Sequence, residues 1–219
     1  MNDSLLMVFV KNLIPGMVKT RLAKDIGIDA ALNVYMELVF HTNEVADKIA
    51  VDKAVYYSEY VEIEDVWDTE QYSLGVQKGK DLGEKMTNAF DEAFDSYIKV
   101  IIIGSDCYEL TPKIVNDAYT ELEGHDLVVG PAKDGGYYLL GMKEYYPQLF
   151  QNKKYGTDTV LEDLLIEAAN LDLSVFELPM LSDIDTFDDL KESGIDWENL
   201  GQEEFDEEEP GLEEDTYEG

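Results

Sequence analysis

Hydrophobic and polar positions follow two alternating patterns over most of the 219-residue chain. Short apolar runs predict strands, whereas longer stretches with apolar residues three or four apart predict helices. The predicted strands are residues 5–10, 53–58, 72–76, 99–104, 127–130, 137–141 and 174–178. The predicted helices are residues 29–49, 82–97, a helix from residue 112, residues 160–170 and a short helix after residue 186. Residues 59–71 fit neither pattern and are expected to be irregular.

Residues typical of helix N-termini support several of these helices. Thr111 precedes Pro112, the usual order of an N-cap and a first helical residue. Thr159 and Glu162 have the spacing of a capping box. The helix at 29–49 is expected to bury one apolar face, consisting of Leu32, Tyr35, Met36, Val39 and Phe40.

The order of elements predicts the fold class. Strands alternate with helices, and residues 100–103 form the continuous apolar run expected of a parallel strand covered on both faces. The chain is therefore expected to form an α/β three-layer sandwich with a mostly parallel central sheet. In such sheets ligands bind beyond the carboxyl ends of the strands, and candidate residues are sought there.

The charge balance is strongly acidic. The chain has 49 acidic and 16 basic residues and a net charge of −33, which makes nucleic acid and anionic membrane surfaces poor partners. Thirteen acids and no Lys or Arg lie between residues 192 and 219. We expect one domain at residues 1–200 and an acidic, disordered tail at residues 201–219.

Three features predict a cytoplasmic protein. No apolar run approaches the roughly 18 residues that span a bilayer, so no membrane insertion is expected. The N-terminus lacks the basic region of a secretory signal. Cys107 is the only cysteine, which excludes an internal disulfide and is typical of a reducing compartment. We expect it to be a small buried residue.

The segment after the first strand is cationic. No acid occurs between residues 4 and 24, and Arg21 is the only arginine of the chain. In so acidic a protein this segment indicates an anion site. Its basic residues are Lys11, Lys19, Arg21 and Lys24.

The same segment has residues suited to phosphate. Pro15 and Gly16 predict a turn, after which Lys19 can bind phosphate oxygens as a point charge and Arg21 as a bidentate fork. Thr20 lies between them. The alternative is a solvated loop whose cations pair with acids elsewhere.

Carboxylates follow two of the predicted strands. Asp106 comes directly after the most hydrophobic strand, where it can hold a divalent cation or cap the next helix. Asp183 and Asp185 precede the short C-terminal helix. Together with Asp106 they would suit magnesium or manganese, but Asp185 or Thr186 could equally cap that helix.

A glycine-rich turn follows the strand at 127–130. Asp134, Gly135 and Gly136 are typical of a hairpin, and paired glycines also permit close approach of the backbone to a ligand. Tyr137 begins the next predicted strand.

Five motifs occur in the order found in one family. They are Pro15-Gly16-x-x-Lys19-Thr20-Arg21-Leu22, Asp81-Leu82-Gly83-Glu84, Gly104-Ser105-Asp106-Cys107, Gly130-Pro131-Ala132-x-Asp134-Gly135-Gly136-Tyr137-Tyr138-Leu139 and Asp183-Ile184-Asp185-Thr186-x-x-Asp189-Leu190. Over residues 5–192 the chain resembles bacterial glycosyltransferase-like proteins of the arsenosugar-biosynthesis type, within the nucleotide-diphospho-sugar transferase superfamily.

The resemblance implies a GT-A-like fold and a set of roles. Asp106, Asp134 and Asp185 would be catalytic, and the metal ligands would be Asp106 and Asp185, with Asp183 as a third candidate. The phosphate site would contain Pro15, Gly16, Lys19, Thr20, Arg21 and Lys24. The acceptor or sugar side would contain Gly135, Gly136 and Tyr137.

The leading hypothesis is metal-dependent transfer of a sugar from a nucleotide-diphosphate donor to a small-molecule acceptor, with Mg²⁺ or Mn²⁺ as cofactor. One alternative is nucleotidyl transfer from a nucleoside triphosphate to a phosphorylated acceptor, because the segment 19–22 resembles the triphosphate loop of guanylyltransferases of cofactor biosynthesis. A non-catalytic nucleotide-binding protein is the third hypothesis.

Overall fold

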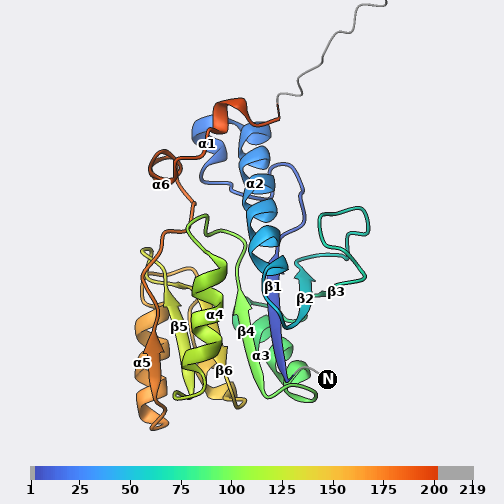
Figure 1. The fold of residues 1–219 in the computed structure, drawn as a ribbon. Helices are drawn as coiled ribbons and strands as arrows, with labels where there is room; N and C mark the ends of the chain where they lie inside the picture. Colours follow the sequence, from blue (N-terminus) through green and yellow to red (C-terminus); the bar gives the residue numbers. More distant parts are fainter. Residues whose placement is uncertain (1–2, 202–219) are drawn as a thin grey trace, which may run out of the picture.

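The computed structural model describes residues 3–201 (Figure 1). These residues form one seven-stranded sheet with helices on both faces. Of the acidic tail predicted at residues 201–219, residues 202–219 lie outside the described part of the chain.

The sheet has the strand order β3-β2-β1-β4-β6-β5-β7. Only β6 runs antiparallel, to both β4 and β5; the other neighbouring strands are parallel. This confirms the predicted α/β fold with a mostly parallel sheet. The strands are β1 (Ser4–Val10), β2 (Asp52–Tyr57), β3 (Tyr72–Val76), β4 (Lys99–Ile103), β5 (Leu127–Pro131), β6 (Tyr137–Met142) and β7 (Val175–Glu177).

Helices cover the two faces of the sheet. Helices α2 and α4 pack on one face and α3 and α5 on the other, which gives the predicted three layers (Figure 1). The α-helices are α1 (Ala23–Ile26), α2 (Ile28–Asp47), α3 (Leu82–Phe94), α4 (Pro112–Glu121), α5 (Val160–Asn170) and α6 (Phe187–Ser193). The 3₁₀ helices are η1 (Pro147–Phe150) and η2 (Trp197–Asn199). The short α1 was not predicted.

Strands β1 and β4 form the centre of both cores. Successive side chains of a strand point to opposite faces. Leu6 and Ile101 accordingly join the core under α2 and α4, whereas Met7 and Ile102 join the core under α3 and α5. The apolar run of β4 is thus buried from both sides, as predicted.

Two predictions about helix ends have different outcomes. Thr111 caps α4, because its hydroxyl accepts a hydrogen bond from the N–H of Ile114. The capping box at Thr159 is wrong: its backbone is not extended (ψ 0°), and its side chain makes no capping hydrogen bond. A capping box instead opens α6, where Thr186 and Asp189 bond each other's backbone N–H groups.

The predicted apolar face of α2 is also partly wrong. Met36 and Phe40 are 36% and 49% exposed. Helix α2 turns a neighbouring stripe that includes Val34 and Leu38 toward the sheet, so these side chains take the core positions.

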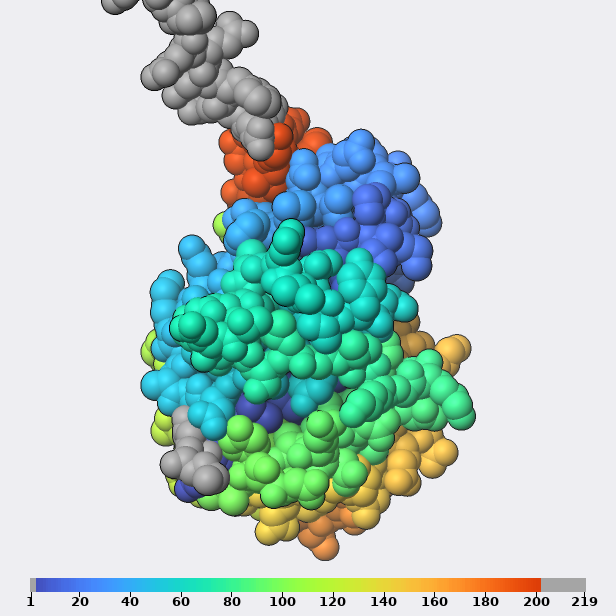
Figure 2. Space-filling model, turned by 90° about the vertical axis from the view of Figure 1, so that its right-hand side faces the viewer, coloured from blue at the N-terminus to red at the C-terminus, as the bar shows by residue number. Residues whose placement is uncertain are grey.

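The irregular segment between β2 and β3 packs over one edge of the sheet. Trp67 is buried there against Tyr72, with ring centroids 5.2 Å apart. Asn12, directly after β1, is buried and holds the start of this segment, since its side-chain amide donates to the carbonyl of Tyr60 at 2.9 Å. Figure 2 shows the segment in teal, beneath the blue residues that follow β1.

Residues 3–201 contain no helix with the length and apolar character needed to cross a membrane.

The double-sided core yields a stability prediction. Ile101→Ala should lower the free energy of unfolding by about 2–5 kcal/mol, because it leaves a cavity at a completely buried position of β4. Urea unfolding measures this loss. The control Ile98→Ala removes the same atoms from a side chain that is 58% exposed and should cost far less; equal losses would contradict the packing described.

Candidate functional site

Four loops meet beyond the carboxyl ends of the parallel strands. They are residues 11–22 after β1, residues 104–111 after β4, residues 132–136 between β5 and β6, and residues 178–186 before α6. Two backbone hydrogen bonds join the last three of these loops: Ile184 N–H donates to the carbonyl of Asp106, and Lys133 N–H to the carbonyl of Leu181, each at 3.0 Å. The motifs that contain Asp106, Asp134 and Asp185 are far apart in the sequence, but they therefore lie together at this edge of the sheet.

Lys19 is the central residue of this edge. Its side chain is 2% exposed, and its ammonium lies 2.6 Å from Asp106 Oδ1 and 3.2 Å from Asp185 Oδ1. Its φ of 46° is in the left-handed region, which a lysine adopts only when the surrounding structure requires it. The sequence predicted Lys19 as a phosphate ligand and both aspartates as metal ligands. The structure pairs these groups with one another.

The ion pairs favour the charged forms of Lys19 and Asp106. Burial would lower the pKa of Lys19, but Asp106 and Asp185 raise it above its usual value. Burial would likewise raise the pKa of Asp106, but Lys19 and, more weakly, Lys11 hold it below its usual value.

A buried hydroxyl network supports the cluster and was not predicted. Tyr35 of α2 accepts a hydrogen bond from the N–H of Lys11 at 2.8 Å and contacts Ser105 Oγ at 2.9 Å. Its ring centroid lies 5.8 Å from the ammonium of Lys19. The sequence analysis assigned Tyr35 to the apolar core. Its hydroxyl was the available signal, because a buried tyrosine requires a polar partner.

Asp185 is positioned by its neighbours. The carboxylate of Asp189 accepts hydrogen bonds from the N–H of Asp185 at 3.1 Å and of Thr186 at 2.7 Å. Thr186 is therefore the N-cap of α6, and the side chain of Asp185 remains available to Lys19.

Asp183 and Cys107 lie in the same acidic surroundings. Burial, together with the charges of Asp106 and Asp134, raises the pKa of Asp183 to about 7. Burial, with Asp183 nearby, raises the pKa of the Cys107 thiol to about 12, so it is not activated as a nucleophile. The prediction of a small, buried cysteine is confirmed.

The turn between β5 and β6 requires its first glycine. Gly135 has a φ of 88°, and a Cβ atom there would lie 2.1 Å from the carbonyl oxygen of Asp158. Asp134 is exposed and accepts a hydrogen bond from the N–H of Gly136 at 2.8 Å. Tyr137, in contrast, points into the core, where its hydroxyl donates to the sulfur of Met86 at 3.6 Å.

The other basic side chains of the segment after β1 are exposed. Lys11, Arg21 and Lys24 form no ion pair with any residue between 3 and 201, and Thr20 is exposed beside them. Gly16 has a φ of 76° in the turn after Pro15. The alternative hypothesis was that the cations of this loop pair with acids elsewhere. Within residues 3–201, that is true of Lys19 but not of Lys11, Arg21 and Lys24.

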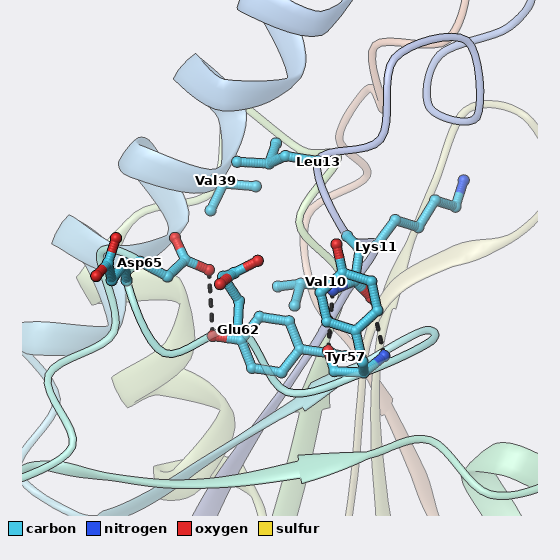
Figure 3. Close-up of a pocket in the computed structure, with 10 residues that line it drawn as sticks. Val10, Lys11, Leu13, Val39, Tyr57, Glu62 and Asp65 are labelled. Carbon is cyan, nitrogen blue, oxygen red and sulfur yellow. Dashed lines mark hydrogen bonds between the residues drawn. The ribbon is translucent and has the colours of Figure 1, made fainter.

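A pocket opens between the ends of β1 and β2, next to the cationic loop. Its cavity volume is about 120 Å³. Figure 3 shows Val39 and Leu13 on one side, the carboxylates of Glu62 and Asp65 on the other, and Lys11 extending away. This pocket was not predicted from the sequence. The acids of the irregular segment after β2 were its only signal.

A larger open groove of about 500 Å³ lies elsewhere, between α3 and the chain after η1. Its lining includes the acidic residues Asp81 and Glu84, with Lys153 as its basic residue. This groove is less suited to a phosphate than the edge that carries Arg21.

The carboxylate pair has the chemistry of a magnesium or manganese site. Both metals prefer hard oxygen ligands, and Asp106 and Asp185 already share a cation, the ammonium of Lys19. No three Asp, Glu, His or Cys side chains of residues 3–201 converge as a ready-made metal site. The two aspartates therefore fit a metal that also takes oxygen ligands from a bound phosphate.

Comparison with known proteins identifies the family. The family model described as "Uncharacterized protein conserved in bacteria (DUF2064)" matches residues 38–157. The chain belongs to this family. No curated protein matches it.

Solved structures share the fold. A protein from Desulfovibrio desulfuricans G20, provisionally called a nucleotide-diphospho-sugar transferase, is 33% identical, with 87% of this chain and 85% of that chain covered and a TM-score of 0.80. The inositol-1-phosphate CTP transferase from T. maritima is 14% identical, with 91% and 96% covered and a TM-score of 0.58. Rv0371c from Mycobacterium tuberculosis H37Rv, in complex with manganese, is 12% identical, with 88% and 97% covered and a TM-score of 0.54. The last two show the fold alone.

The raised pKa of Asp183 makes stability depend on pH. The folded state binds a proton that the unfolded carboxyl releases near its ordinary pKa, so the contribution of Asp183 to stability falls as pH rises from about 4 to 7. Asp183→Asn should therefore stabilise the metal-free protein at pH 8, by about 2–4 kcal/mol, and much less at pH 5.

Urea unfolding in EDTA at both pH values measures this difference. The exposed Asp91→Asn removes the same charge from a surface position of α3 and should change stability equally little at both pH values. A gain for Asp183→Asn that does not grow with pH would contradict the buried carboxyl.

Proposed function

We propose that this chain is a metal-dependent transferase that moves a sugar from a nucleotide-diphosphate donor to a small acceptor. This is the activity implied by its resemblance to glycosyltransferase-like proteins of the arsenosugar-biosynthesis type. One observation carries the proposal. Exposed cations that form no ion pair within residues 3–201 adjoin the buried Lys19 and its partners Asp106 and Asp185, at the ligand edge of a mostly parallel sheet in a protein of net charge −33.

The phosphates of the donor would lie on the loop after β1. Arg21 can form a bidentate contact with one phosphate, and Lys11 and Lys24 add charge on either side. The nucleoside would extend into the pocket between β1 and β2, where Val39 and Leu13 offer apolar contact and Glu62 and Asp65 offer acceptors. The pocket and the cations are neighbours because residues 11–13 line the pocket and the same segment continues to Arg21 and Lys24.

The metal would be held by Asp106 and Asp185. Asp183, on the same loop as Asp185, is a third candidate, but within residues 3–201 it does not converge with these two carboxylates. When bound, the metal supplies positive charge that neutralises the departing diphosphate. The hydrogen bonds of Asp189 orient the loop that carries Asp185, and the network of Tyr35 and Ser105 orients the loop after β4.

The acceptor would approach the turn of Asp134, Gly135 and Gly136. One oxygen of Asp134 accepts the N–H of Gly136, which leaves the other free to accept a proton from an acceptor hydroxyl. Tyr137 supports this turn from the core.

Nucleotidyl transfer is the second candidate. It is favoured by the resemblance of residues 19–22 to a triphosphate loop of guanylyltransferases. The protein and Mn²⁺ are incubated either with nucleotide-diphospho-sugars and small hydroxyl acceptors, or with nucleoside triphosphates and sugar phosphates. The released product distinguishes the two reactions. Sugar transfer releases a nucleoside diphosphate, whereas nucleotidyl transfer releases pyrophosphate. Tight nucleotide binding with neither product would instead indicate a non-catalytic binding protein.

Arg21→Lys tests the phosphate loop directly. The lysine keeps the charge but loses the fork, so affinity for the nucleotide that most raises the melting temperature should fall about ten- to a hundred-fold, or ~1.5–3 kcal/mol. Calorimetric titration measures the affinity. The melting temperature without ligand should stay unchanged, because Arg21 is exposed and unpaired within residues 3–201.

The opposite pattern would contradict the proposal. If Arg21→Lys melts early but its folded fraction binds nucleotide normally, Arg21 has a structural role.

A further inference from the structure

Lys19 lies between the two carboxylates that the proposed function assigns to the metal. Its ammonium contacts Oδ1 of both Asp106 and Asp185, and its side chain is almost completely buried. The two aspartate side chains are 31% and 44% exposed. The carboxylates are therefore open to solvent on one side, and the lysine covers the oxygens that face inward.

We propose that Lys19 is an exchangeable counter-ion: its ammonium and a divalent metal exclude each other between Asp106 and Asp185, and nucleotide phosphates resolve the competition by taking Lys19. This inference rests on the proposed function and deepens it. It makes Lys19 a phosphate-binding residue that couples metal binding to donor binding.

The charges favour exchange over simultaneous occupation. Two carboxylates and one ammonium leave a net charge of −1, which attracts a metal ion. A divalent ion beside a retained ammonium would bring +3 against −2 in a partly buried place, where repulsion between cations is strong. Donor phosphates add negative charge at the neighbouring Arg21. Both cations can then be accommodated, with Lys19 on phosphate and the metal on the aspartates.

The backbone of Lys19 supports a second position. Its φ of 46° is unfavourable for a side chain with a Cβ atom, so the contacts of Lys19 with Asp106 and Asp185 hold the loop in a strained conformation. When those contacts are lost, this strain favours movement of the loop. The next basic residue, Arg21, is already exposed two positions along the same loop.

The exchange predicts reciprocal coupling. Metal alone competes with Lys19 and binds weakly, whereas metal and nucleotide each strengthen the binding of the other, as linkage requires.

Mn²⁺ binding without nucleotide tests the exclusion. Free Mn²⁺ is measured by electron paramagnetic resonance in titrations of the full-length protein, its Lys19→Met variant and its Lys24→Met variant. Both variants lose one positive charge near the site, but only Lys19 contacts the carboxylates. Lys19→Met should bind Mn²⁺ about tenfold or more tightly than the parent, the equivalent of one charged hydrogen bond, and Lys24→Met should resemble the parent. Equal or weaker binding by Lys19→Met, or no binding by any of the three proteins, would overturn the proposal.

Footprinting of the parent protein keeps the test decisive if Lys19→Met does not fold. Acetylation of lysines by an amine-reactive ester is followed by peptide mass spectrometry with and without saturating Mn²⁺. Lys19 should be protected without metal and react several-fold faster with it, whereas the exposed Lys24 should react alike in both. Protection of Lys19 while Mn²⁺ is bound would show that both cations share the site, and would refute the exchange.

Neither experiment uses a nucleotide. Failure of the exchange would thus leave nucleotide binding intact, and failure of nucleotide binding would leave the Mn²⁺ result unchanged.

Discussion

The ion pairs of Lys19 with Asp106 and Asp185 are the contact on which the ligand edge depends. Lys19 and Asp185 are 166 positions apart in the sequence, and Asp106 comes from a third segment. A buried charge is costly unless it is paired, so the loops after β1, β4 and β7 must come together for any of them to be stable. One buried lysine thus anchors the cationic loop and leaves its remaining basic residues exposed.

The topology of the sheet explains why the contact forms here. Strand β1 lies between β2 and β4. From β1 the chain continues to β2 on one side, and from β4 it continues to β5 on the other side. The loops after β1 and β4 therefore diverge at one point, where α/β sheets bind ligands. The antiparallel β6 joins β4 to β5 and brings the turn of Asp134 to the same edge.

The sequence predicted those features that depend on local pattern. The apolar runs of β1 and β4 and the Thr111–Pro112 pair are local signals, and the structure confirms them. Helix α1 has only four residues, too few for a periodic pattern. The exposed Met36 and Phe40 show that the sheet selects which stripe of α2 is buried.

The arrangement within the site could be predicted only in part. The motifs brought Lys19, Asp106 and Asp185 to one edge, but their pairing depends on side-chain reach between distant segments. Tyr35 looked like a core residue because its ring packs in the core. Only its hydroxyl bonds to the loops. Asp65 joins the pocket through a bond to Tyr57 across an irregular segment, where no periodicity guides prediction.

The central claim is that a nucleotide binds at the edge held together by Lys19. A crystal structure with Mn²⁺ and the nucleotide that most raises the melting temperature tests it most directly. We expect phosphate oxygens against Arg21 and Lys19, the base between the ends of β1 and β2, and the metal on Asp106 and Asp185. A nucleotide bound in the groove between α3 and η1, with Lys19 still paired to Asp106, would contradict it.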